Sequence, residues 1–182
     1  MLVDKSLEQM MEEIGFTQWV KYDLITLDPD QFEVGDISSD ELLEDNELDR
    51  YIKRLLRECD PSYKSGLQFE DKFATISLAL ENAYVHAHNF ERRELSLKVF
   101  SGEKGNVVRL RDSGKGFDWK NTVEQLRSGS RYFQNLGSGF EVFDKSPYEV
   151  SFEGRGNTIN MMIAQTESIL RSSAAANPST QF

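Results

Sequence analysis

The chain has 182 residues and a mass of 20.9 kDa, the size of one domain with short extensions, and this length excludes a large multidomain assembly. Asp and Glu number 31 against 21 Lys and Arg, so the net charge is −10 and the pI is near 4.8. That charge has the wrong sign for a protein that neutralises nucleic-acid phosphates or an anionic membrane surface.

Cys59 is the single cysteine, which excludes an intramolecular disulfide and a multi-cysteine metal site. The start of the chain is not a basic and apolar signal segment, and no stretch approaches the roughly 20 apolar residues that span a bilayer. We therefore expect a protein of the reducing cytoplasm that contacts neither nucleic acid nor membrane.

Acidic residues are concentrated between Tyr22 and Asp49, where eleven occur without a lysine or an arginine. Such a run is typical of a solvated face, and it would also suit the docking of a basic partner. The sequence leaves both interpretations open.

In chain order, residues 1–20 carry apolar side chains near helical spacing and are expected to form a short helix within an N-terminal extension, residues 1–30. A strand is expected at residues 31–37. A helix with Ser39 as its N-cap follows. Its apolar face comprises Leu43, Leu48, Tyr51, Ile52, Leu55 and Leu56. A second helix is predicted at residues 69–88, with apolar residues on one side.

From Glu94 the apolar period changes to two, which predicts a β-hairpin that turns at residues 102–105 and ends at Asp112. The remaining expected elements are a helical piece at residues 122–127, a short helix after Gly139, and strands at residues 148–153 and 158–163. We expect residues 31–168 to form one α+β domain, a two-layer sandwich of helices on a mixed, mostly antiparallel sheet. The polar tail, residues 169–182, is expected to be disordered.

Residues 80–86, 111–117 and 136–140 carry chemistry, together with the glycine-rich turn at residues 154–158. After a strand, the Asp112 carboxylate can accept a hydrogen bond from an exocyclic amine. The backbone at Gly114 and Gly116 can approach a flat base because neither residue has a Cβ.

The segment around Gly137, Ser138 and Gly139 opens a helix, so its backbone N–H groups and the helix dipole favour an anion. On the second predicted helix, Asn82 offers a hard oxygen that can complete an octahedral Mg²⁺ site formed mainly by phosphate oxygens and water. Each feature alone is also common in ordinary turns and helix surfaces, so only their combination indicates a nucleotide site.

In combination the segments resemble the N-box, G1-box, G2-box and final Gly-Thr element of the GHKL (gyrase, heat-shock chaperone, histidine kinase and MutL) ATP-binding superfamily. The resemblance covers about residues 31–165, and it implies a Bergerat-type ATP-binding fold. The chain length and His86, four residues after Asn82, make it most similar to the anti-sigma-factor serine kinases of bacterial partner-switching systems.

The resemblance implies that ATP and Mg²⁺ are bound by Asn82, Asp112, Gly114, Gly116, Gly137, Ser138, Gly139 and Thr158. Within this set Asn82 would coordinate the metal, Asp112 would read the adenine amine, and Thr158 would line the adenine side. Residues 118–136 would form a lid over the phosphates. In this lid, Arg127 and Arg131 are candidates for phosphate or partner contact, or for a solvated surface.

Leu78 departs from the family pattern, because catalytically active relatives carry a general-base Glu at this position. The nearest carboxylate is Glu81, which points roughly 60° further round the helix. Glu81 is therefore the candidate catalytic residue. The alternative is a protein that binds ATP with little or no turnover.

The resemblance implies an ATP-binding regulatory protein that sequesters a protein partner, such as a sigma factor or an antagonist protein, and that forms a homodimer through its first helices. The sequence leaves open whether the protein also phosphorylates a Ser or Thr of an antagonist, because a leucine occupies position 78. The alternative is a catalytically inactive module, with or without nucleotide, that acts through protein contacts alone.

Overall fold

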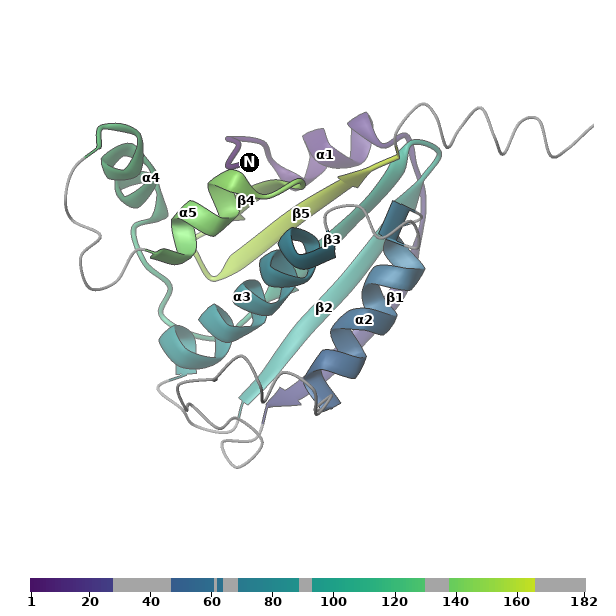
Figure 1. Ribbon diagram of the computed structural model, residues 1–182, viewed down its shortest axis with the longest axis horizontal. Coiled ribbons are helices and arrows are strands. Elements are labelled where there is room, and N and C mark those ends of the chain that lie inside the picture. Colours follow the sequence, from purple (N-terminus) through teal and green to yellow (C-terminus); the bar gives the residue numbers. More distant parts are fainter. Residues whose placement is uncertain (28–46, 61, 64–68, 89–92, 130–137, 166–182) are drawn as a thin grey trace, which may run out of the picture.

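The computed structural model describes residues 1–27, 47–60, 62–63, 69–88, 93–129 and 138–165 (Figure 1). The helices are α1 (Leu7–Glu13), α2 (Glu47–Cys59), α3 (Phe69–His88), α4 (Trp119–Arg127) and α5 (Ser138–Lys145). The strands are β1 (Phe16–Leu27), β2 (Arg93–Gly102), β3 (Gly105–Arg111), β4 (Glu149–Glu153) and β5 (Thr158–Ala164). Across these ranges, every helix is too short or too polar to cross a membrane.

The strands form one open sheet in the order β1-β2-β3-β5-β4, and all neighbouring strands are antiparallel. The predicted hairpin is confirmed, because β2 and β3 pair from Gly102 opposite Gly105 to Ser96 opposite Arg111. Outside the named strands, Leu2 forms a parallel bridge with Val150 at the edge of β4. The architecture is therefore α+β, as expected, with a wholly antiparallel set of strand pairings.

Alternation along the strands separates the two faces of this sheet. On β3, Val108 and Leu110 belong to the main hydrophobic cluster, whereas Val107 belongs to a second cluster. Helices α2, α3 and α5 cover the first face, which we call the helical face (Figure 1). The opposite, outer face packs at one end against Met10 and Ile14 of the N-terminal region.

Helix α1 covers only part of the N-terminal segment that was expected to be helical. Ser6 and Gln9 form a capping box at its start, and Gly15 adopts φ +63° just beyond its end. From Phe16 the chain forms β1, an edge strand that was not predicted. Two register irregularities, one of them between Trp19 and Lys21, interrupt the alternation that would mark a strand.

The other expected elements agree with the structure where it describes them. In α2, Ile52, Leu55 and Leu56 are buried in the main cluster. The predicted helix at residues 69–88 is confirmed as α3. Helix α4 begins earlier than expected because Asp118 caps it, its carboxylate accepting a hydrogen bond from the Asn121 N–H. The strand at residues 31–37, the Ser39 cap and the tail lie outside the described residues.

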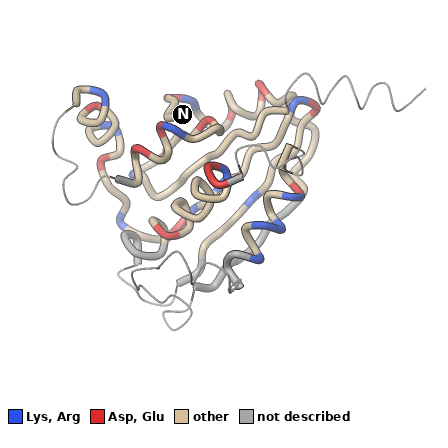
Figure 2. Tube along the Cα trace, viewed as in Figure 1, with Lys and Arg blue, Asp and Glu red and all other residues tan. Residues whose placement is uncertain are grey.

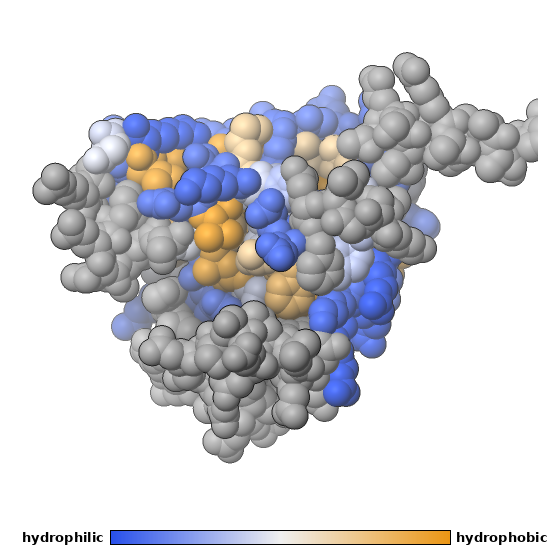
Figure 3. Space-filling model, in the orientation of Figure 1, coloured by the Kyte–Doolittle hydropathy of each residue, from blue (hydrophilic) through white to orange (hydrophobic). Residues whose placement is uncertain are grey.

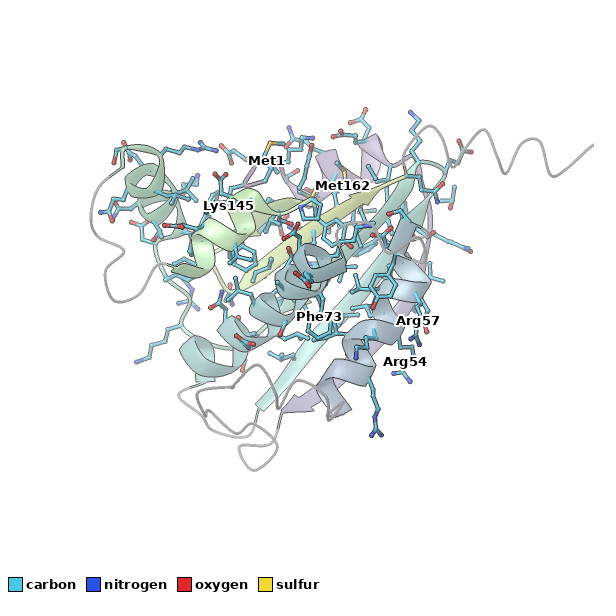
Figure 4. All side chains as sticks on the ribbon, in the orientation of Figure 1. Met1, Arg54, Arg57, Phe73, Lys145 and Met162 are labelled. Carbon is cyan, nitrogen blue, oxygen red and sulfur yellow. The ribbon has the colours of Figure 1, made fainter. Side chains whose placement is uncertain are left out.

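Most of the acidic run also lies outside the described residues, but helix α2, which follows it, carries an exposed basic surface. Its residues Arg50, Arg54 and Arg57 are exposed, and Figure 2 shows Lys and Arg positions along this helix. Figure 4 shows Arg54 and Arg57 pointing outward from α2. The excess of acids over bases is thus not uniform along the chain.

A buried ion pair ties the end of α2 to α3 and to the start of β4. Lys72 Nζ lies 2.9 Å from Asp60 Oδ2, and the two side chains are only 5% and 4% exposed. The Tyr148 hydroxyl donates to the same carboxylate at 2.8 Å. Burial alone would raise the pKa of Asp60, but hydrogen bonds from Ser62, Lys72 and Tyr148 outweigh it and hold the pKa below its ordinary 3.8.

Replacing the carboxylate tests this ion pair. Asp60→Asn leaves the Lys72 ammonium buried without a counter-charge, so we expect it to lower the free energy of unfolding at neutral pH by about 3–5 kcal/mol. Since folding lowers the pKa of Asp60, its contribution is fully present above about pH 3.8 and is lost as the pH falls through the folded value. Urea unfolding of both proteins across acidic pH measures the difference.

The matched control is Lys145→Gln, which removes an exposed pair between Lys145 and Glu141. Little change in stability is expected there, because water screens such pairs. Equal stability of Asp60→Asn and the parent protein at neutral pH would contradict a stabilising role for the buried carboxylate.

Candidate nucleotide-binding site

Helix α5 begins directly against α3. A Cβ added to Gly139, in the first turn of α5, would lie 3.3 Å from Leu78 Cδ1 and 3.7 Å from Asn82 Nδ2. The structure thus brings together two segments that are far apart in the sequence and that were both predicted to belong to the site. Apolar surface gathers over α3 and α5 on the helical face (Figure 3), where Val142 is 36% exposed.

Asn82 is half-buried, and its side-chain amide makes no hydrogen bond with any residue that the structure describes. A polar group in this position has both an acceptor and a donor to offer to a ligand. Ser138 is the first residue of α5, so the backbone N–H groups of Ser138 and Gly139 belong to the first turn of the helix, where N–H groups have no intrahelical partner. Gly137, the remaining predicted residue of this segment, lies outside the described residues.

The loop of residues 112–117 is hydrogen-bonded to the turn between β4 and β5. The Asp112 N–H donates to the carbonyl of Asn157 at 3.1 Å, and the Phe117 N–H donates to the carbonyl of Arg155 at 2.5 Å. In return, Asn157 Nδ2 donates to the Asp112 carbonyl at 3.3 Å. These contacts fix the ends of the loop on one turn.

Two glycines permit this close approach. Gly116 has φ +71°, and a Cβ there would overlap with the Arg155 carbonyl oxygen. Gly156 has φ +83°, and its Cβ would lie 2.7 Å from the Phe117 carbonyl oxygen. Within the loop, the Gly114 N–H donates to Asp112 Oδ1 at 2.7 Å, so one carboxylate oxygen organises the loop itself.

Aromatic rings connect this loop to α5. The Phe117 ring contacts that of Phe140 edge-on at 5.6 Å and that of Phe152 at 5.7 Å. Phe140 and Phe152 are stacked, with their centroids 5.2 Å apart. Because Phe140 follows Gly139, the same rings that support the loop also position the start of α5 beside Asn82.

The strand register separates Thr158 from Asp112. Thr158 pairs with Arg111 on one side and with Glu153 on the other. Directly opposite residues share a face of a sheet, and Arg111 and Glu153 both line a cleft on the outer face. Asn157 is the residue that contacts Asp112, a pairing that motif spacing alone did not reveal.

Leu78 and Glu81 occupy different environments on α3. Leu78 is partly buried and packs against the main hydrophobic cluster. Glu81 is exposed, and its carboxylate accepts a hydrogen bond from the Ser77 hydroxyl at 3.1 Å. The surface that faces Gly139 therefore carries a leucine rather than a carboxylate.

Part of the expected lid is helix α4, which is packed on the domain. Val123 of α4 belongs to the main cluster, and Arg127 Nη2 donates to the carbonyl of Leu2 at 3.4 Å. Arg131 and the rest of residues 130–137 lie outside the described residues. In the described part of the chain, Arg127 contacts the N-terminal segment.

Within the described ranges no group of three or more His, Cys, Asp or Glu side chains is placed to hold a metal ion. A magnesium ion beside Asn82 would accordingly take most of its ligands from phosphate oxygens and water, as Mg²⁺ commonly does. The donor set fits a metal that arrives with a nucleotide.

Comparison of the chain with protein-family models, with curated proteins and with solved structures finds no match.

Substitution of Gly116 tests the close approach of loop and turn. Gly129 provides a matched control, since it has φ +68° but nothing within 4 Å of an added Cβ. We expect Gly129→Ala to cost about 1–2 kcal/mol of unfolding free energy from backbone strain alone. Gly116→Ala adds the overlap with Arg155, so it should cost about 1–3 kcal/mol more. Urea unfolding measures both, and equal losses would contradict the close approach.

Proposed function

We propose that the chain is an ATP-binding regulatory protein with a Bergerat-type fold, similar to the anti-sigma-factor serine kinases of the GHKL superfamily. One observation carries the proposal: the half-buried amide of Asn82, which has no hydrogen-bond partner among the residues that the structure describes, lies against Gly139 in the first turn of α5. A metal ligand and a helix N-terminus at one place suit a magnesium-bound polyphosphate.

At the phosphate end, the Asn82 side-chain oxygen would bind magnesium. The backbone N–H groups at Gly137, Ser138 and Gly139 would donate hydrogen bonds to phosphate oxygens. Bound magnesium would neutralise part of the phosphate charge. Gly139 suits this role because its missing side chain leaves the start of α5 close to α3.

At the base end, the Asp112 carboxylate would accept a hydrogen bond from the adenine amine, with Gly114 and Gly116 shaping the adjoining backbone. The loop is suited to hold this carboxylate in place, because it is hydrogen-bonded to the turn that contains Asn157. We assign Asn157 to this site next to Asp112. Thr158, which pairs with Arg111, would line the adenine side, as in the proteins that the chain resembles.

The chemistry at α3 favours nucleotide retention over phosphoryl transfer. Leu78 cannot accept a proton, and Glu81 is engaged with Ser77 on its own helix. Loss of a general base lowers a rate by about 10²–10⁴. We infer a protein that holds Mg-ATP while it sequesters a protein partner, with homodimer formation and a cytoplasmic setting as in the proteins it resembles.

Calorimetric titration with Mg-ATP tests the proposal. The protein should bind, and Asp112→Asn should weaken binding about tenfold or more. The asparagine oxygen would stay with the Gly114 N–H, and the NH2 group would then face the adenine amine, which needs an acceptor. The matched control is Asp4→Asn, the same change at an exposed residue of the N-terminal segment. Absence of measurable binding to the parent protein would overturn the proposal and leave a nucleotide-free interaction module.

Release of γ-phosphate separates retention from transfer in the same preparations. The parent protein should show no turnover above buffer while it binds Mg-ATP. Leu78→Glu should introduce turnover, and Leu78→Gln, which matches Glu in size but lacks its basicity, should not. Turnover by the parent protein would contradict the retention function while leaving the nucleotide site intact.

A further inference from the structure

The outer face of the sheet contains a cleft of about 280 Å³ beside α1. Leu7 and Phe100 give it apolar walls, and the side chains of Lys98, Arg109 and Arg111 give it three cations. We call this site the outer cleft. It is separate from the candidate nucleotide site, which is built from α3, α5 and loops at the helical face.

The cations of the outer cleft are placed close together by the strand register. Lys98 on β2 lies directly opposite Arg109 on β3, and like charges in this arrangement repel each other. Arg111 follows Arg109 on the same face of β3, because side chains alternate along a strand. The protein has a net charge of −10, yet three cations line this one cleft at its surface.

Two acidic side chains, Glu8 and Glu153, also line the outer cleft. Glu153 Oε2 lies 2.8 Å from Arg109 Nη1, while its other oxygen accepts a hydrogen bond from the Leu7 N–H at 2.7 Å. Hydrogen bonds from its own backbone N–H and from Ser6, together with the nearby charge of Arg109, lower the pKa of Glu8, the second carboxylate of the cleft. Arg111 is exposed and makes no hydrogen bond or ion pair with the described residues.

We propose that the outer cleft binds a small organic phosphate monoester. An arginine guanidinium can donate two parallel hydrogen bonds to phosphate oxygens. A phosphate monoester carries about −1.5 to −2 charges at pH 7, so it matches a site with several cations better than a singly charged carboxylate does. The apolar body of the ligand would lie against Leu7 and Phe100. The cleft is slightly smaller than usual drug-sized sites of about 300–1,000 Å³, so the ligand is small.

Residues of the outer cleft directly precede residues of the candidate nucleotide site in the sequence. Arg111 directly precedes Asp112, and Glu153 directly precedes the turn at residues 154–158. The two sites open on opposite faces of the sheet. The proposal therefore does not depend on ATP binding, and each can fail without the other.

Titration of the full-length ¹⁵N-labelled protein with phenyl phosphate tests the proposal, with amide chemical shifts as the readout. We expect saturable shifts in β2 and β3 around Lys98 and Arg111. The double variant Lys98→Gln/Arg111→Gln should bind about tenfold or more weakly, whereas Lys145→Gln, which removes an exposed cation elsewhere, should match the parent protein. Inorganic phosphate should bind several-fold more weakly than phenyl phosphate, and phenol should not bind.

Saturating Mg-ATP distinguishes the two sites. Shifts around Lys98 and Arg111 that persist in Mg-ATP support the outer cleft, whether or not ATP itself binds. Shifts confined to residues 112–117 and 154–158 that disappear with Mg-ATP would overturn the proposal, because phenyl phosphate would then occupy the nucleotide site. Unchanged affinity in a double variant that retains the native spectrum would overturn it as well, and so would an absence of shifts in the parent protein.

Discussion

The closeness of two backbone segments determines the rest of the candidate site. The loop of residues 112–117 and the turn of residues 154–158 approach so closely that neither Gly116 nor Gly156 has room for a Cβ. Phe117 is held by this contact, and its ring touches Phe140 at the start of α5. The position of α5 against Asn82 thus depends on a contact made by backbone atoms elsewhere in the fold.

The same sheet separates two kinds of chemistry. On its helical face, the half-buried Asn82 amide and the N-terminus of α5 form the site that we propose for a magnesium-bound polyphosphate. On its outer face, Lys98, Arg109 and Arg111 form a cationic cleft in a chain of net charge −10. The net charge argues against large anionic partners, and both sites that we propose are for small anions.

Periodicity predicted much of the fold, and two of the predicted site segments, around Asn82 and Gly139, lie side by side in the structure. The β2–β3 hairpin and α3 followed from alternating and helical patterns, whereas β1 did not, because register irregularities near Trp19 interrupt its pattern. The sequence alone revealed that Leu78 occupies the position at which a general-base carboxylate is expected. The pairing of Asp112 with Asn157 depends on strand register. The Asp60–Lys72 pair joins distant segments, so no local pattern could indicate it.

Amide hydrogen exchange with and without Mg-ATP tests the central claim most directly, because it reports on each segment separately. The account predicts slower exchange on Mg-ATP binding in residues 112–117 and in the first turn of α5, with little change in β2. Unchanged exchange in both segments under conditions where Mg-ATP is bound would contradict it, because the nucleotide would then occupy another part of the molecule.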